Sequence, residues 1–260
     1  MGTCARTGVR GTGLRAVLGV LVPVLALLAS EAARAATVRV AAAASVEPAL
    51  AEIGPAFERA TGHRLEVIGG ATGKLTTQVI QGAPFDVLLA ADAEHPEILE
   101  KQGLAVAGSR VSYARGRLVL WSPHGGKNLG AGTLRAGRFA HLAIADPATA
   151  PYGAAAVAVL RELRVYDALA PKLVLGESVG QTFAFVKSGA AELGFVALSQ
   201  VARESGGSRW LVPEELHPPL VHQAVLLSRA KDDAAALAFL RSLAGDGAKA
   251  TLRRFGYSLP

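Results

Sequence analysis

The chain has 260 residues and a formal net charge of +6, with 51% hydrophobic and 18% charged residues. Its Lys and Arg residues form no cluster, and no zinc-finger or RNA-binding motif is present, which argues against a nucleic-acid partner. One cysteine and six histidines without H-x-x-x-H or H-E-x-x-H spacing argue against a disulfide framework and a metal site, and we expect these histidines to be isolated surface or loop residues.

Residues 1–35 have the pattern of a signal peptide. Arginines precede the apolar run AVLGVLVPVLALLA (residues 16–29), and Ala33-Arg34-Ala35 offers a small-x-small cleavage site. The apolar run is too short to span a bilayer. We therefore predict export and a mature chain that starts at Ala36. Cys4 would leave with the leader, so the mature chain would contain no thiol.

The mature chain alternates expected strands and helices, which predicts an α/β fold with parallel sheets covered on both faces. The helical spacing of Leu50, Ile53 and Phe57, for example, predicts a helix directly after the first strand. The expected strands are 37–45, 63–70, 85–92, 117–123, 141–150, 172–178, 191–197, 210–213 and 219–228. The expected helices are 46–62, 74–83, 95–103, 151–169 and 179–189, with terminal helices over 232–256. A Gly-rich connector separates the strands 117–123 and 141–150.

Four of the turns from strand to helix contain small or hydroxyl-bearing residues. They are Ala44-Ser45, Ala71-Thr72, Ala150-Pro151-Tyr152 and Ser178-Val179. Helix starts at the carboxyl ends of strands present unpaired N–H groups with partial positive charge. Two turns on each side of the connector would therefore line a cleft that suits an anion held by neutral donors. The alternative is that the hydroxyls only cap their helices, which stabilises a fold by about 1 kcal/mol.

The stretch GGATGKLTTQ (residues 69–78) resembles a nucleotide-binding phosphate loop. Only three residues separate Gly69 from Gly73, however, and Leu75 stands where a metal-binding hydroxyl should follow the lysine. The sequence therefore argues against an ATPase. We expect Lys74 to be a solvated residue of the first helical turn.

The stretch GESVG (residues 176–180) matches the G-x-S-x-G motif of α/β-hydrolases and supports a competing hypothesis. Ser178 would be the nucleophile, and the chain lacks an HGGG-type oxyanion stretch. The partners that follow in the required order are His217 or His222 as the base, with Glu192, Glu214 or Glu215 as the acid.

Four stretches together resemble the periplasmic molybdate-binding proteins of ABC transporters, in order and spacing. They are AAAASVEPALAEIGPAFERATG, ATGKLTTQVIQGAPFDVLLAAD, IADPATAPYGAAAVAVL and ESVGQTFAFVKSGAAELGFVALSQV. The resemblance covers the mature chain and implies a two-lobed type II periplasmic-binding-protein fold with molybdate or tungstate in the cleft. It implies one lobe from residues 36–115 plus 218–260 and another from 116–217.

The resemblance also implies the residues of the site. Ser45 would supply a hydroxyl and a backbone N–H, Thr72 a second hydroxyl, and Tyr152 and Val179 a backbone N–H each. Some members of the family add a tyrosine hydroxyl near the end of the GFVALSQ-like segment. This sequence has Ala197 there, so that donor is missing, and the phenol of Tyr152 is a candidate replacement.

By this resemblance the chain is a periplasmic binding protein and no enzyme, with no cofactor. We expect a monomer that delivers its anion to a membrane permease and, through it, to a cytoplasmic ATPase. A receptor for sulfate, phosphate or vanadate is the alternative within the same class. A secreted serine hydrolase that uses Ser178 is the alternative from a different class.

Overall fold

The computed structural model describes residues 1–3, 5, 35–124 and 128–259. The predicted signal peptide lies almost entirely outside the described residues. Within the described ranges, none of the helices combines the length and the apolar character that a membrane crossing requires.

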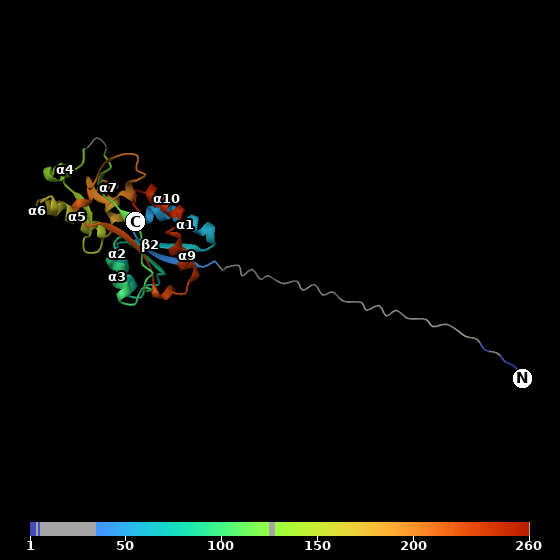
Figure 1. Cartoon of the computed structure of the whole chain (residues 1–260). Helices are drawn as coiled ribbons and strands as arrows, with labels where there is room; N and C mark the ends of the chain where they lie inside the picture. Colours follow the sequence, from blue (N-terminus) through green and yellow to red (C-terminus); the bar gives the residue numbers. More distant parts are fainter. Residues whose placement is uncertain (4, 6–34, 125–127, 260) are drawn as a thin grey trace. The chain divides into compact units, whose positions relative to one another are not determined.

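Two five-stranded sheets covered by helices form the part of the chain from residue 35 onward (Figure 1). The first sheet has the order β2-β1-β3-β10-β4, and the second has the order β7-β6-β8-β5-β9. The strands are β1 (Thr37–Ala43), β2 (Arg64–Gly70), β3 (Val87–Ala90), β4 (Val111–Gly116), β5 (Leu118–Ser122), β6 (Leu142–Ala145), β7 (Leu173–Gly176), β8 (Leu193–Ala197), β9 (Ser208–Leu211) and β10 (Leu220–Leu226).

Helices connect these strands. They are α1 (Glu47–Thr61), α2 (Thr72–Ile80), α3 (Glu94–Lys101), α4 (Ala131–Ala136), α5 (Pro151–Glu162), α6 (Tyr166–Leu169), α7 (Val179–Lys187), α8 (Leu198–Val201), α9 (Ala234–Ser242) and α10 (Asp246–Arg254). Short 3-10 turns are η1 (Ala170–Lys172), η2 (Glu214–Leu216) and η3 (Ser228–Ala230). We call the first sheet with α1–α3, α9 and α10 the first lobe, and the second sheet with α4–α8 the second lobe.

Alternating side chains of the first sheet pack against helices on opposite faces. Val38 and Val40 of β1 belong to the core that includes residues of α1, α9 and α10. Their neighbour Ala41 belongs to the core formed with α2 and α3. Because successive side chains of a strand point to opposite faces, the buried apolar residues 40–43 of β1 show that both faces of the sheet are covered at this strand.

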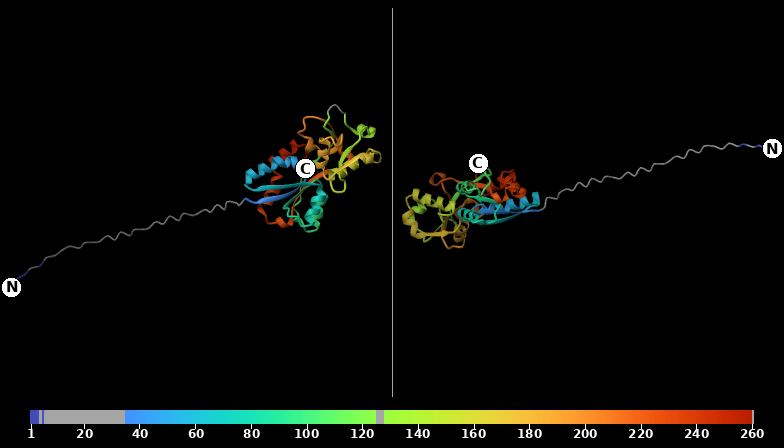
Figure 2. Two further views of the ribbon diagram at one scale, coloured as in Figure 1. Left: turned by 180° about the vertical axis from the view of Figure 1, so that it is seen from behind. Right: turned by 90° about the horizontal axis from the view of Figure 1, so that it is seen from below.

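The second sheet is covered in the same way. Leu118 and Leu120 of β5 pack in the core that contains residues of α4 and α5. Val119 and Trp121 of the same strand pack with residues of α7 and α8. Figure 2 shows from two further sides that the yellow and orange segments of the second lobe lie beside the blue and red segments of the first.

The prediction that the sheets are purely parallel is wrong. Strands β2, β1 and β3 are parallel, as are β7, β6 and β8, but β10 is antiparallel to β3 and β4, and β5 is antiparallel to β8 and β9. The antiparallel strands lie where the chain passes between the sheets. Strand β4 ends at Gly116 and β5 of the other sheet begins at Leu118, and the chain returns from β9 to β10.

Three local predictions also differ from the structure. Strand β4 and helix α4 were not expected, because their sequences show neither clear alternation nor helical spacing. The helix expected at residues 151–169 is two helices, because Arg164 adopts a left-handed backbone conformation with φ of 57° between them. The lobe boundaries implied by the resemblance, 36–115 plus 218–260 and 116–217, remain a proposal.

Candidate anion site between the lobes

A narrow cavity lies between the two lobes. The residues that line it are Ala43, Ala44, Ser45, Gly70, Ala71, Thr72 and Ala91 from the first lobe and Ala150, Pro151, Tyr152 and Val179 from the second. All four site residues implied by the resemblance are therefore brought together. Within the described part of the chain, no charged side chain and no histidine lines this cavity.

The backbone N–H groups at this cavity are buried and lack partners. Ser45 and Thr72 are fully buried, and Tyr152 and Val179 are at most 4% exposed. Thr72, Tyr152 and Val179 lie in the first turns of α2, α5 and α7, where N–H groups have no partner within the helix. Among the described residues, no acceptor takes the N–H of any of the four. Four buried donors thus face a common space.

The two hydroxyls at the cavity differ in their contacts. The backbone N–H of Ala91 donates to Thr72 Oγ1 at 3.1 Å, so the hydroxyl proton of Thr72 is left to donate elsewhere. Ser45 Oγ is buried and lies beside the phenol of Tyr152, and among the described residues no group forms a hydrogen bond of good geometry with it. Ser45 is not the cap of α1, since the N-cap is Val46. The hydroxyls are therefore more than helix caps, and together with the N–H groups they form a set of neutral donors.

Close backbone approaches bring the donors together. A side chain at Gly153, beside Tyr152, would lie 2.2 Å from the carbonyl oxygen of Ala145, so α5 approaches β6 closely only with glycine there. Between the lobes, the N–H of Gly73 donates to the carbonyl of Thr149 at 2.8 Å. The turns that carry Thr72 and Tyr152 are thereby held across the cavity from each other.

The phenol of Tyr152 points to a buried aromatic cluster. Its hydroxyl lies 3.4 Å from Nε2 of His222, and the hydroxyl of Tyr113 lies 3.3 Å from Nδ1 of the same ring. Tyr257 packs edge-on against His222 at 5.2 Å. Burial raises the pKa of the Tyr152 phenol and lowers the pKa of His222 to about 3, so the imidazole is neutral. The phenol of Tyr152 thus belongs to this cluster, whereas its backbone N–H in the first turn of α5 has no partner among the described residues.

The expectation for the histidines is wrong for His222. This residue is fully buried on β10, and His217 is also buried. Sequence reasoning missed the cluster because its members, Tyr113, Tyr152, His222 and Tyr257, come together only through the strands that pass between the lobes. No motif in the sequence connects them.

Lys74 lies in the first turn of α2 with a solvent-exposed side chain, as expected, and it also forms an ion pair. Its ammonium group lies 3.1 Å from a carboxylate oxygen of Glu177, which belongs to the other lobe. The two side chains are 42% and 74% exposed, so solvent screens the pair and its contribution is small. Neither residue lines the cavity, and the pair links the first turn of α2 to the turn that precedes α7.

Ser178 has the environment of a helix cap. Its hydroxyl accepts the N–H of Gln181 at 3.3 Å at the start of α7. His217 contacts the carbonyl of Pro218, and His222 belongs to the aromatic cluster. The described residues therefore place neither histidine as a base for Ser178.

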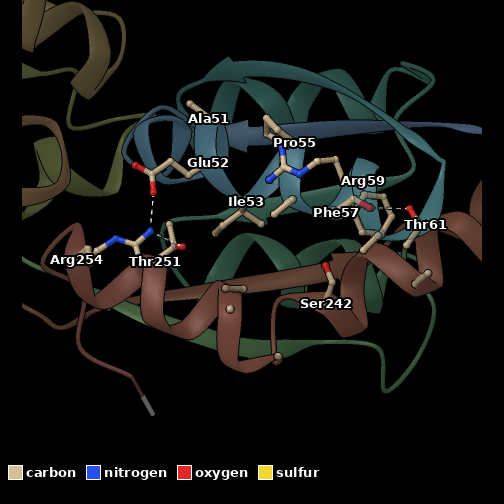
Figure 3. Close-up of a pocket in the computed structure, with 16 residues that line it drawn as sticks. Ala51, Glu52, Ile53, Pro55, Phe57, Arg59, Thr61, Ser242, Thr251 and Arg254 are labelled. Carbon is tan, nitrogen blue, oxygen red and sulfur yellow. Dashed lines mark hydrogen bonds and ion pairs between the residues drawn. The ribbon is translucent and has the colours of Figure 1, made fainter.

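A wider groove lies on the first lobe alone, between α1 and α10 (Figure 3). Small apolar side chains line much of it, and Arg254 donates to Glu52 across it at 2.6 Å. The groove is open, and its lining includes the carboxylate of Glu52, which would repel an anion. It is a less suitable anion site than the cavity between the lobes.

Comparisons with known proteins identify similar chains. The family model described as bacterial extracellular solute-binding protein matches residues 38–258. The molybdate-binding protein ModA of Azotobacter vinelandii is 48% identical over 233 residues, which cover 88% of this chain and 92% of the relative. ModA of Rhodobacter capsulatus is 43% identical over 246 residues, which cover 95% and 94%.

A solved structure supports the same likeness. It is that of the periplasmic molybdate-binding protein of Azotobacter vinelandii, with a TM-score of 0.83 and 37% sequence identity. The match covers 86% of this chain and 99% of the solved chain. The likeness therefore extends over both lobes.

The neutral state of His222 predicts a dependence of stability on pH. In the unfolded chain its imidazole gains a proton near pH 6.5, whereas the folded protein keeps it neutral down to about pH 3. The unfolded state binds more protons in this window, so the free energy of unfolding falls as the pH falls. We expect His222 to contribute a loss of about 2 kcal/mol between pH 7 and pH 5.

Urea unfolding of the unaltered protein and of His222→Phe at pH 7, 6 and 5 measures this contribution. The variant should lose less stability over this range, whatever its stability at pH 7. His124→Ala removes an exposed imidazole and serves as the control. Equal losses in the unaltered protein and in His222→Phe would contradict the assignment.

Proposed function

We propose that this chain, which belongs to the family of bacterial extracellular solute-binding proteins, captures molybdate or tungstate between its two lobes. One feature of the molecule supports the proposal above all: the N–H groups of Ser45, Thr72, Tyr152 and Val179 are buried around one cavity without partners. The hydroxyls of Ser45 and Thr72 add two further donors. The relatives that are 43% to 48% identical are molybdate-binding proteins by name.

A tetrahedral oxyanion is the ligand that such a donor set fits. Each hydrogen bond to a charged oxygen contributes about 1.5 to 3 kcal/mol, and several are needed to offset the loss of hydration. A cation would find no carboxylate in the cavity lining. Neutral donors fixed at four backbone positions also select by size, because a smaller anion leaves some bonds long. Sulfate is therefore the informative competitor.

The proposed ligand is the solute that is transported, and it is not a cofactor. The protein would act in the periplasm, after removal of a signal peptide near Ala35, and pass the anion to a membrane permease that works with a cytoplasmic ATPase. We propose no catalytic residue, because Ser178 caps α7. A binding protein of this kind would act as a monomer.

Calorimetric titration with molybdate, tungstate and sulfate tests the proposed function. We expect molybdate and tungstate to bind with dissociation constants of about 1 μM or lower, and sulfate to bind much more weakly. Ser45→Ala should weaken molybdate binding by about 10- to 100-fold, which corresponds to one lost charge-assisted bond. Thermal unfolding of the ligand-free Ser45→Ala protein shows separately whether the same change affects the fold.

Ser188→Ala is the matched control for this titration. It removes an exposed serine hydroxyl that donates to the carbonyl of Phe185, at the end of α7 away from the cavity. Tight sulfate binding without a molybdate signal, or a Ser45→Ala protein that binds molybdate as the unaltered protein does, would contradict the proposal.

Closure of the two lobes generates a separate prediction for Gly73. A methyl group at this position would lie 3.0 Å from the carbonyl oxygen and 3.1 Å from Cα of Thr149, both of them backbone atoms of the other lobe. Gly73→Ala should therefore hinder the close approach and weaken molybdate binding by about tenfold. The methyl group would also lie 3.2 Å from Nε2 of His95 in the same lobe, so the stability of the ligand-free variant is measured beside its affinity.

Gly247→Ala in α10 provides the control, since a methyl group there meets open space. Titration calorimetry gives the affinities, and thermal unfolding without ligand reports on the fold. Unchanged affinity of Gly73→Ala would show that the approach to Thr149 has no part in binding.

A further inference from the structure

The short helix α8 contacts two residues of the site from behind. Ser199 Oγ donates to the carbonyl oxygen of Ser45 at 2.6 Å. The next residue, Gln200, donates from Nε2 to the carbonyl oxygen of Val179 at 3.0 Å. Ser45 belongs to the first lobe and Val179 to the second. Two adjacent side chains of α8 therefore hold peptide groups on both sides of the cavity.

The carbonyl of Ser45 receives a second bond. The hydroxyl of Tyr257, in the segment after α10, donates to the same oxygen at 2.6 Å. Both lone pairs of this carbonyl are thus occupied by side-chain hydroxyls. The carbonyls of Thr72 and Tyr152 lie within helices, whereas Ser45 lies in the turn before α1. No backbone N–H of the described residues donates to the carbonyl oxygen of Ser45. Its orientation depends on Ser199 and Tyr257.

The orientation of this peptide affects anion binding directly. A carbonyl oxygen carries partial negative charge and would repel an oxyanion if it faced the cavity. The two hydroxyls hold it away, and Ser45 Oγ and the backbone N–H are left to face the ligand. In a buried site of low dielectric, both the attraction of a correctly placed donor and the repulsion of a misplaced carbonyl are large.

Helix α8 is itself fixed in place. The N–H of Ala197 donates to Gln200 Oε1 at 3.0 Å, so the amide of Gln200 cannot turn without losing this bond. Arg203, just after α8, forms an ion pair with Glu52 of α1 and lies 4.7 Å from the ring centre of Phe255. The helix of the second lobe is therefore attached to the first lobe, next to the Ser45 turn.

We propose that Ser199, Gln200 and Tyr257 are positioning residues of the anion site, which set the peptide orientation of Ser45 and Val179 without contacting the ligand. This inference rests on the proposed function. Because one hydroxyl can hold the Ser45 carbonyl when the other is lost, Ser199 and Tyr257 substitute for each other in part. Their effects on affinity should therefore be strongly non-additive.

A double-mutant cycle tests this inference. Ser199→Ala and Tyr257→Phe should each weaken molybdate binding by only about threefold, and the double variant by about 10- to 100-fold. The preference for molybdate over sulfate should fall in the double variant as well. Ser199→Thr keeps the hydroxyl and should restore the affinity. Gln200→Leu should weaken binding through Val179 by about three- to tenfold.

Ser242→Ala is the matched control, because Ser242 Oγ also donates to a backbone carbonyl, that of Phe239 at 2.7 Å, but on α9 away from the cavity. Thermal unfolding without ligand separates effects on the fold from effects on binding. If the double variant does not fold, the single variants test the inference. Ser199→Ala should then bind molybdate more weakly than Ser199→Thr. Gln200→Leu should bind it more weakly than Ser242→Ala.

Several outcomes would overturn the inference. One such outcome is a double variant that binds molybdate as tightly as the unaltered protein. Another is strictly additive losses of affinity together with an equal loss in Ser242→Ala. Either result would show that these contacts only stabilise the fold. If the unaltered protein and the variants bind molybdate with the same affinity, only the positioning role fails. If the unaltered protein binds no molybdate, tungstate or sulfate, the proposed function fails and this inference fails with it.

Discussion

The first N–H groups of a helix have no carbonyl partner within that helix, and the cavity between the lobes is built on this constraint. Helices α2, α5 and α7 each place a residue of the first turn at the cavity, and the Ser45 turn adds another, so we propose that their N–H groups face it. Buried donors without partners are unfavourable, so a ligand that accepts from all of them is strongly stabilised. Small residues such as Ala44, Gly73 and Gly153 let the backbones come close enough for the groups to converge.

The division of the donors between two lobes explains the rest of the arrangement. Ser45 and Thr72 come from one sheet and Tyr152 and Val179 from the other, so the site is complete only when the lobes are together. The contacts between the lobes lie beside the cavity and leave its lining free of charge. The proposed selectivity therefore comes from the fixed distances between neutral donors, and a charged side chain would hold a smaller anion as well.

Much of this could be predicted from the sequence, because it depends on local signals. The four turns were recognisable from strands that end in small residues and from helical spacing after them, and the structure brings Ser45, Thr72, Tyr152 and Val179 to one cavity. The antiparallel strands β5 and β10 could not be predicted, since their direction is set by where the chain passes between the lobes. The contacts of His222, Ser199 and Tyr257 were missed for a related reason: they join residues far apart in the chain and leave no pattern in it.

A crystal structure of the mature chain grown with molybdate, with the metal located by its anomalous scattering, tests the central claim most directly. We expect a single strong peak for the metal in the cavity. The oxygens of the anion should lie within hydrogen-bond distance of the N–H groups of Ser45, Thr72, Tyr152 and Val179. The hydroxyls of Ser45 and Thr72 should also donate to the anion. A metal bound elsewhere, or an anion in the cavity that leaves these N–H groups without contact, would contradict it.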